Sequence, residues 1–466
     1  MKKIILILCA VVFVFNAFPQ DITGQWNGVL KVQTMHLRIV FHITKNDSSY
    51  TATMDSPDQG ARGIPVTTTS FENPKLKLEV KNAGIEYAGE LKDKIIEGTF
   101  KQGGLTIPLN LTRDTATQTS LKGPQEPAPP YPYYTEEVSF PNTGANITLA
   151  GTLTLPKKEG NYPAVILITG SGPQSRDEEV MGHKPFLVIA DYLTRNGIAV
   201  LRYDDRGVAH STGDFKTATS ADFATDVESA IAYLKGRKEI NRNEIGLIGH
   251  SEGGLIASMV AARSKDVHFM VLLAGTGLRG DQVLLLQQEL MAKASGVPAA
   301  SIQKGKAINA KVFQMVEDAT KSDSLKATLT DYFRQVVSDS SSGISIPKGM
   351  TADQLISLET NQITSPWMEY FIKYDPAVAL RKVKCPVLAV DGEKDVQVAA
   401  KENLAAIKDA LEKGGNKNVV IKTYPNLNHL FQECTTGLPS EYATIEQTFS
   451  PVVLDDITKW IQQQVK

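Results

Sequence analysis

The chain of 466 residues has little cysteine, no excess of one charge and no long hydrophobic run. Its three cysteines are too few for a fold built on a disulfide framework. Its formal net charge of −2 gives no reason to expect nucleic acid or an anionic membrane surface as a partner. The longest apolar run extends from Ile4 to Phe15, shorter than the ~20 residues that a transmembrane helix needs. Hydrophobic residues make up 42% of the chain and charged residues 21%, so we expect an ordinary globular protein with no stable membrane insertion.

The N-terminal segment up to Gln20 has the pattern of a secretory signal peptide. Lys2 and Lys3 precede the apolar run, although no A-x-A cleavage site is present. A buried helix of the mature protein is the alternative, which two lysines at the extreme N-terminus disfavour. We therefore expect an exported protein, either periplasmic or secreted. Its mature chain keeps Cys385 and Cys434. We expect both to be buried free thiols, and a disulfide between them is the alternative.

Residues 21–114 are predicted to form a small all-β domain. Apolar and more polar side chains alternate along MHLRIVFHI, and about eight such short runs are separated by Gly, Asn, Asp and Pro. This spacing indicates a meander barrel or a sandwich. The segment GQWNG around Trp26 resembles the G-x-W that opens lipocalin-like barrels. Residues 115–135 are rich in proline and have no periodicity, so we expect a semi-rigid linker there.

From residue 136 to residue 466, two opening strands are followed by apolar strands that alternate with amphipathic helices. Continuous Val, Ile and Leu runs, such as PAVILI and CPVLAV, indicate parallel strands that are buried on both faces. Residues 278–375 interrupt this alternation with helical patterns alone. We expect this segment to form a helical cap over the carboxyl edge of the sheet, where open α/β sheets bind ligands.

The stretch EIGLIGHSEGGLIASMV contains the pattern G-x-S-x-G around Ser251. An apolar run precedes the pattern and a helical pattern follows it, which is the strand–turn–helix setting of a nucleophilic serine. Gly249 and Gly253 leave room for a sharp turn in which larger side chains would collide. The helix that begins there directs free amides and the positive end of its dipole at the serine. A serine in an ordinary turn is the alternative, but this setting favours a catalytic nucleophile.

A nucleophilic serine needs a histidine as general base and a carboxylate that orients the histidine. In this architecture the acid follows the serine, and the histidine follows the acid. Of the seven histidines, only His268 and His429 follow Ser251, and His268 opens a strand at the end remote from the chemistry. His429 is therefore the predicted base. In CPVLAVDGEKDVQV, Asp395 is favoured as the acid because it lies on the loop itself, and Asp391 at the strand end is the alternative.

The negatively charged oxygen of the tetrahedral intermediate needs backbone donors, which form an oxyanion hole. The amide of Glu252, directly after the nucleophile, is the first candidate. The amide of Ser171, in the loop after PAVILITG, is the second, with Gly172 close behind and a plain flexible loop as the alternative. This chemistry uses no metal ion and no organic cofactor, so neither is expected.

Several stretches of residues 136–466 resemble the α/β-hydrolase superfamily, and within it the bacterial carboxylesterases grouped with serine aminopeptidase-like hydrolases. They are ITGSGPQSRDE, RYDDRGVAHSTG, GHSEGG, SPWMEYFIKYDP, CPVLAVDGEKDVQV and NHLFQ, in order through the domain. The resemblance implies a mostly parallel eight-stranded sheet and acyl hydrolysis, with Ser251 as nucleophile, Asp395 as orienting acid and His429 as general base. In that family DDRGVAHSTG is chiefly a structural turn, so its polar residues are not expected to be catalytic: Asp205, Arg206 and Ser211.

Other functions have weaker support. GTGLRG, residues 275–280, matches a dinucleotide-binding pattern, but no strand ending in an acid about 20 residues further on follows it. A non-catalytic carbohydrate- or lipid-binding protein would not need all three triad residues. A serine peptidase with the same triad would need carboxylates for an ammonium group, and the cap offers Glu289, Glu317 and Glu369.

We therefore expect an exported serine hydrolase that cleaves small-molecule carboxylic esters through an acyl-enzyme, with peptide hydrolysis as the alternative. Some apolar residues of the cap are candidates for shaping the acyl or alcohol pocket, with packing inside the cap as the alternative role: Leu284, Leu285, Trp367 and Phe371.

Overall fold

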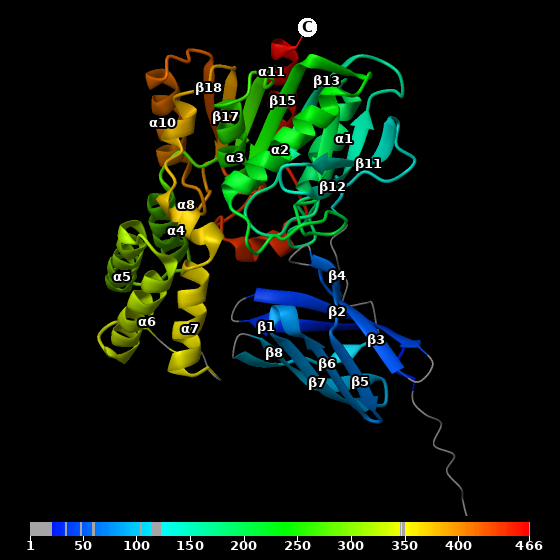
Figure 1. Cartoon of the computed structure of the whole chain (residues 1–466), viewed down its shortest axis with the longest axis vertical. Helices are drawn as coiled ribbons and strands as arrows, with labels where there is room; N and C mark the ends of the chain where they lie inside the picture. The colour runs from blue at the N-terminus through cyan, green and yellow to red at the C-terminus, as the bar shows by residue number, and fades with distance from the viewer. Residues whose placement is uncertain are drawn as a thin grey trace, which may run out of the picture.

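The computed structural model describes residues 21–32, 35–46, 49–57, 61–102, 105–113, 123–344, 346 and 350–465. The predicted signal peptide lies outside the described residues. The described chain has an N-terminal all-β part and a C-terminal α/β part, each with its own hydrophobic core (Figure 1).

Antiparallel strands form the N-terminal part, in a curled sheet with the order β4-β3-β2-β1-β10-β8-β7-β6-β5 and with β9 paired to β8. The side chains of Trp26, Phe41 and Tyr87 are fully buried in its core. The predicted all-β domain is therefore confirmed. Its strands are β1 (Gly24–Val32), β2 (Met35–Asn46), β3 (Ser49–Ser56), β4 (Ala61–Pro65), β5 (Thr68–Glu72), β6 (Lys75–Val80), β7 (Ile85–Lys92), β8 (Ile95–Gln102), β9 (Leu105–Pro108) and β10 (Leu111–Thr112).

Apolar and polar side chains alternate along LTIPLNL, residues 105–111, a pattern that predicts one strand, but the structure contains β9 and β10 there. Strand β9 pairs with β8 alone, whereas β10 pairs with both β1 and β8. The break follows Pro108, which has no amide hydrogen to donate to a ladder.

The C-terminal part contains a sheet of eight strands in the order β11-β12-β14-β13-β15-β16-β17-β18. The pairs β11–β12 and β12–β14 are antiparallel, and the others are parallel. Every residue of β14, β16 and β17 is buried, as expected for parallel strands covered on both faces. The strands are β11 (Tyr134–Asn142), β12 (Ile147–Leu155), β13 (Tyr162–Ile168), β14 (Ala199–Tyr203), β15 (Ile240–His250), β16 (Phe269–Leu273), β17 (Val387–Gly392) and β18 (Val419–Tyr424).

Helices cover both faces of this sheet. On one face lie α1 (Pro185–Arg195) and α11 (Pro451–Gln464). The other face carries α2 (Ser220–Lys235), α3 (Glu252–Ala261), α9 (Ala377–Leu380) and α10 (Ala400–Lys413). The α/β-hydrolase fold expected from the sequence is present.

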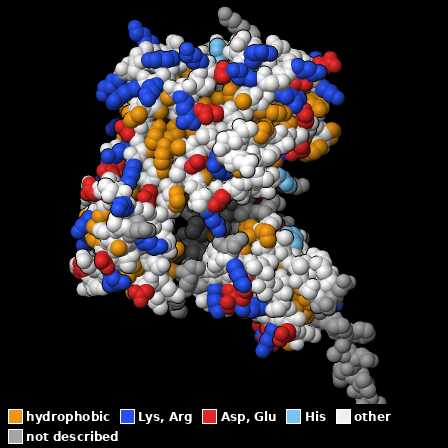
Figure 2. All heavy atoms as spheres, in the orientation of Figure 1, with side chains coloured by type: hydrophobic (Ala, Val, Ile, Leu, Met, Phe, Trp, Pro, Cys, Tyr) orange, Lys and Arg blue, Asp and Glu red, His pale blue; other side chains and the backbone are white. Residues whose placement is uncertain are grey.

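Between β16 and β17, the helices α4 to α8 precede the short sheet-covering helix α9. In Figure 1, α4 to α8 lie below the sheet, on the same side as the all-β part, and Figure 2 shows a hollow between the two. We call these helices the cap, and they have a core of their own around Val312, Phe313 and Leu329. They are α4 (Gly280–Ala294), α5 (Ala299–Asp318), α6 (Ser322–Ser338), α7 (Ala352–Ile363) and α8 (Pro366–Lys373).

The segment before β11 is held more firmly than the linker prediction implies. Gln125 Nε2 donates to the carbonyl of Phe449 at 2.7 Å, and Gln125 Oε1 accepts from the amide of Thr448 at 2.8 Å. The end of the predicted linker therefore docks onto the loop that leads into α11, and β11 begins at Tyr134.

The two cysteines of the α/β part are free thiols. The expectation that both are buried was wrong, because Cys385 and Cys434 are each only partly buried. Cys385 lies just before β17, and Cys434 lies in the loop after β18.

Candidate active site

Ser251 lies in the sharp turn between β15 and α3. Its backbone has φ 55° and ψ −118°, a strained conformation for a residue with a Cβ. A Cβ at Gly249 would lie 2.1 Å from the carbonyl oxygen of Gly253, and a Cβ at Gly253 would lie 2.2 Å from the carbonyl oxygen of Ile168. Both positions therefore require glycine, for the steric reason inferred from the sequence.

His429 lies in the loop after β18 and is hydrogen-bonded to Asp395, with Nδ1 and Oδ2 2.5 Å apart. Both side chains are almost completely buried. The other oxygen of Asp395 accepts the amides of Gln397 at 2.7 Å and Val398 at 2.8 Å. Because Nδ1 of His429 is bonded to Asp395, Nε2 is the nitrogen available to a substrate or nucleophile.

Asp391, the alternative acid, has a different environment. It is fully buried at the end of β17, where Oδ1 accepts the amide of Gly392 at 2.7 Å. Burial, and then the nearby charge of Asp395, raises the pKa of Asp391 well above its ordinary value. The raised pKa disfavours a charge on Asp391, and the carboxylate bonded to His429 is that of Asp395.

His250 precedes Ser251 in the turn between β15 and α3, which we call the elbow (residues 249–253), and it connects this elbow to two other loops. Its Nδ1 lies 2.9 Å from Oε1 of Glu178, and its Nε2 lies 3.0 Å from the carbonyl oxygen of His429. The rings of His250 and His429 are 4.7 Å apart. The same Oε1 of Glu178 accepts the amide of Gly170 at 2.7 Å. One buried histidine and one buried carboxylate thus join the elbow, the histidine loop and the loop after β13.

The charge state of His250 follows from its partners. Burial lowers the pKa of His250, but the charge and hydrogen bond of Glu178 and the carbonyl of His429 outweigh burial, so the pKa is raised. A carbonyl oxygen and an ionised carboxylate can both only accept hydrogen bonds. Both ring nitrogens of His250 therefore carry protons when His250 and Glu178 are charged.

The candidate oxyanion donors lie beside the serine. Glu252 is the first residue of α3, so its amide has no acceptor within the helix. Ser171 follows β13 by three residues and lines the same cavity as Ser251 and Glu252. The neighbouring amide of Gly170 is already donated to Glu178, which leaves Ser171, with Gly172 next to it, as the candidate donors of this loop.

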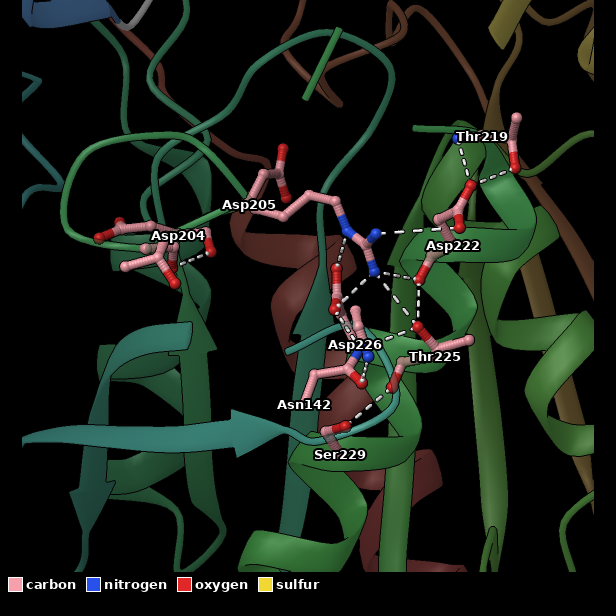
Figure 3. Close-up of polar contacts among 12 residues, drawn as sticks. Asn142, Asp204, Asp205, Thr219, Asp222, Thr225, Asp226 and Ser229 are labelled. Atoms are coloured by element: carbon pink, nitrogen blue, oxygen red, sulfur yellow. Dashed lines mark hydrogen bonds and ion pairs between the residues drawn. The ribbon is translucent and has the colours of Figure 1, made fainter. Parts of the chain in front are cut away.

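The turn DDRGVAHSTG holds this loop in place. Asp205 accepts the hydroxyl of Thr169 at 2.7 Å and the amide of Gln174 at 2.9 Å. Arg206 binds the carboxylate of Asp226 on α2 through Nε, at 2.8 Å, and through a second nitrogen. Figure 3 shows the polar cluster on α2, in which Asp222, Thr225 and Asp226 lie close together and Asn142 joins from β11. The role of this turn is structural, as the resemblance implies.

A cavity of about 380 Å³ lies between the elbow and the cap. Three of the apolar cap residues singled out in the sequence line it, whereas Leu285 packs against the core of the cap. The lining residues are Ser171, Ser251, Glu252, Thr276, Val283, Leu284, Gln287, Gln288, Asn309, Val312, Phe313, Phe333, Glu359, Gln362, Ile363, Trp367, Met368, Phe371, Gln397 and Val398.

The side chain of Glu252 joins the elbow to the cap. Its Oε1 accepts the indole Nε1 of Trp367 on α8 at 2.8 Å and the hydroxyl of Ser220 on α2 at 2.6 Å. Burial raises the pKa of Glu252. The sequence pattern indicates only the backbone role of Glu252, because nothing near it marks Ser220 and Trp367 as its partners.

The cap carboxylates considered for an ammonium group lie outside the cavity lining. Glu289 pairs with Lys293 and Lys306, Glu317 pairs with Arg279, and Glu369 accepts the hydroxyl of Ser322. The cap residue with a carboxyl group that does line the cavity is Glu359 on α7, which was not among the candidates from the sequence. The sequence feature that could have identified Glu359 is its position: it lies one helical turn from both Ile356 and Ile363, so a charged residue shares the apolar side of a helix.

The dinucleotide pattern GTGLRG has a structural explanation. Asn403 Oδ1 accepts the amides of Gly277 and Leu278 at 3.0 and 3.2 Å, so these amides are already paired. Within the described residues, no helix has the length and apolar character of a bilayer span, and no three His, Cys, Asp or Glu side chains are grouped as metal ligands would be.

A family model and a relative both connect the chain with hydrolases. The family model described as "Serine aminopeptidase, S33" matches residues 184–433. Esterase EstD of Thermotoga maritima is 26% identical over 335 residues, which cover 71% of this chain and 69% of EstD.

Two solved structures are similar. The α/β hydrolase GrgF from Penicillium sp. sh18 has a TM-score of 0.44 and 16% identity, covering 71% of this chain and 99% of GrgF. The esterase Pf2001 of Pyrococcus furiosus has a TM-score of 0.44 and 17% identity, covering 72% of this chain and 92% of its own.

The family match covers more than half of the chain and includes the elbow, Asp395 and His429. The resemblance seen in the sequence is confirmed. The chain belongs to the serine aminopeptidase, S33, family of α/β hydrolases.

Proposed function

We propose that this carboxylic ester hydrolase works through an acyl-enzyme on Ser251, with His429 as general base and Asp395 as the acid that orients it. The observation that carries the proposal is the combination of a strained serine beside a cavity with a buried histidine–carboxylate pair at 2.5 Å. The likeness to esterase EstD supports ester over amide substrates.

In the first half of the reaction, Nε2 of His429 takes the hydroxyl proton as Oγ of Ser251 attacks the ester carbon. The amides of Glu252 and Ser171 stabilise the negative oxygen of the tetrahedral intermediate. His429 then gives its proton to the departing alcohol, and the acyl group stays on Oγ. Asp395 stays ionised and stabilises the imidazolium.

In the second half, His429 takes a proton from water while the water oxygen attacks the acyl carbon. The second tetrahedral intermediate collapses and releases the carboxylic acid, and the proton returns to Oγ of Ser251. No step requires a cofactor.

The test is hydrolysis of p-nitrophenyl esters of increasing acyl length, beside aminoacyl p-nitroanilides, by wild type and Ser251→Ala. We expect ester turnover in the wild type and a loss of about 10⁴-fold or more in the variant. Turnover of the anilides with no turnover of the esters would instead identify a peptidase with the same triad. Ester turnover retained in Ser251→Ala would contradict the mechanism.

We also propose that the protein is exported. Lys2 and Lys3, followed by the apolar run from Ile4 to Phe15, support this proposal. The N-terminal sequence of the protein isolated from its native cells is the test: a start near residue 21 is expected, and an intact Met1 would contradict export.

A further inference from the structure

Along α4 and α7, the lining of the cavity beside Ser251 changes from an apolar layer to a polar layer, and Val312, Phe313 and Phe333 add apolar side chains from α5 and α6. The apolar layer is near the elbow, because Trp367 on α8 donates to Glu252 and the start of α4 at Gly280 packs against the backbone of Phe371. Val283 and Leu284 lie in the first turn of α4, so they belong to this layer.

The polar layer lies one helical turn further from the elbow. Gln287 and Gln288 follow the apolar pair of α4 by four residues, and Glu359 precedes Ile363 of α7 by four residues. Four residues of α-helix correspond to about 6 Å. Asn309 on α5 donates to Gln288 at 2.6 Å, so it belongs to the same layer.

Glu359 has unused hydrogen-bonding capacity. In the part of the chain that the structure describes, no hydrogen bond or ion pair of its carboxyl group is recorded, and burial alone raises its pKa. Among the same residues, the side-chain amides of Gln287 and Gln362 also have no hydrogen-bond partner. None of the residues that line the cavity is Lys, Arg or His, so the cavity offers no counter-charge to an anionic substrate.

From this arrangement we propose that the enzyme hydrolyses short-chain acyl esters of a neutral saccharide. The acyl group and the ester carbon lie in the apolar layer, and the sugar hydroxyls bind Glu359, Gln287 and Gln288 in the polar layer. A carboxyl group accepts from a hydroxyl, and an amide both donates and accepts, which matches the two capacities of each sugar hydroxyl. A long alkyl chain in the same place would leave Glu359 and Gln287 without partners. The inference rests on the proposed ester hydrolysis at Ser251.

The experiment compares two acetates of similar shape: a methyl glucoside acetylated on its primary hydroxyl, and cyclohexylmethyl acetate, which lacks the hydroxyls. Release of acetate gives kcat/KM for each in wild type, Glu359→Leu and Glu359→Gln. We expect the wild type to prefer the sugar ester by about tenfold or more. Glu359→Leu should abolish most of that preference, and Glu359→Gln should keep most of it, because the glutamine oxygen still accepts a hydrogen bond. The ratio of the kcat/KM values for the two acetates does not depend on how much of the variant is folded.

Glu289→Gln is the matched control, because the Glu289 carboxylate pairs with Lys293 and Lys306 outside the cavity lining. It should keep the wild-type preference. Acetylcholine serves as a cationic ester. Acetylcholine could prove the best substrate, with its kcat/KM lost as fully in Glu359→Gln as in Glu359→Leu. The polar layer would then bind a cation, and the saccharide proposal would be overturned.

Equal rates on both acetates in the wild type would also overturn it, while leaving ester hydrolysis intact. Absence of turnover of every ester, p-nitrophenyl acetate included, would instead be a failure of the proposed function itself.

Discussion

At the scale of single residues, Asp391 at the end of β17 and Asp395 in the loop after it show how the environment gives two nearby carboxyl groups different properties. Asp395 accepts two amides and contacts His429, whereas Asp391 is buried beside it with a raised pKa. The sequence favoured Asp395 over Asp391 as the orienting acid but could not exclude Asp391, because the preference depended on where the strand was expected to end. The contact with His429 comes from a loop 34 residues away in the chain.

Asparagine at these two positions should therefore have unequal effects. Asp395→Asn removes the charge that holds the His429 imidazolium and should lower kcat by on the order of 10³–10⁴-fold. Asp391→Asn alters a carboxyl group whose raised pKa disfavours its charge, and the bond to His429 is made by Asp395, so kcat should change by less than about tenfold. Steady-state kinetics on p-nitrophenyl acetate measures both. The reverse order of effects would assign the orienting role to Asp391.

The buried pair of His250 and Glu178 predicts a pH-dependent stability. The pKa of His250 is raised above its ordinary value of 6.5 in the folded state, so the protonated form stabilises the fold. This contribution is complete below about pH 6.5 and is lost as the pH rises through the raised pKa. His250→Gln should therefore lower the Tm most near pH 6 and progressively less at alkaline pH.

Thermal unfolding of both proteins from pH 6 to pH 9 measures this difference. The charged and titratable groups near His250, namely Glu178, His429 and Asp395, are the same in both proteins. A Tm difference that stays constant over the range would mean that His250 is neutral in the fold.

At the scale of elements, the strand–turn–helix around Ser251 could be predicted because all of its signals are local. The apolar run, the two glycines and the helical pattern lie within one short stretch. The partners of Glu252 could not be predicted, since Ser220 on α2 and Trp367 on α8 meet it only through the packing of three helices. Glu359 was missed for the same reason: helical periodicity shows that it shares a face with apolar residues, but not that this face borders the cavity.

Removal of the indole hydrogen bond tests how the cap is joined to the elbow. Trp367→Phe keeps an aromatic ring that can pack on Phe371, whose ring is 5.2 Å away. It removes one of the two side-chain donors to buried Glu252. The free energy of unfolding should therefore fall by about 1–2 kcal/mol more than the replacement of an indole by a smaller ring would cause. Trp460→Phe on α11, where the indole packs against Phe269, is the matched control.

Urea denaturation of the two variants gives the comparison. Equal losses of unfolding free energy would mean that the Glu252–Trp367 hydrogen bond contributes nothing measurable.

At the scale of the whole molecule, the all-β part and the α/β part have separate cores. The core of the first contains residues from Ile22 to Leu111, and those of the second begin at Phe140. Composition and periodicity were sufficient to predict this division, since period-two patterns give way to alternating strands and helices after a proline-rich segment. They could not predict that Gln125 docks that segment onto the loop before α11, because the contact spans 324 residues.

The separate cores predict that the α/β part folds and works alone. A variant that begins at residue 123 keeps Gln125 and every residue that lines the cavity. It should hydrolyse p-nitrophenyl acetate with kcat/KM within about threefold of the full chain. Circular dichroism checks its fold. A folded but inactive variant would show that the all-β part contributes to catalysis.

The central claim is that Ser251 is the nucleophile, and labelling with a fluorophosphonate tests it most directly. The reagent forms a covalent bond with an activated serine oxygen, and peptide mass mapping locates that bond. The account predicts one label per chain, on Ser251, and none on folded Ser251→Ala. A label on another residue, or no label on the folded wild type, would contradict it.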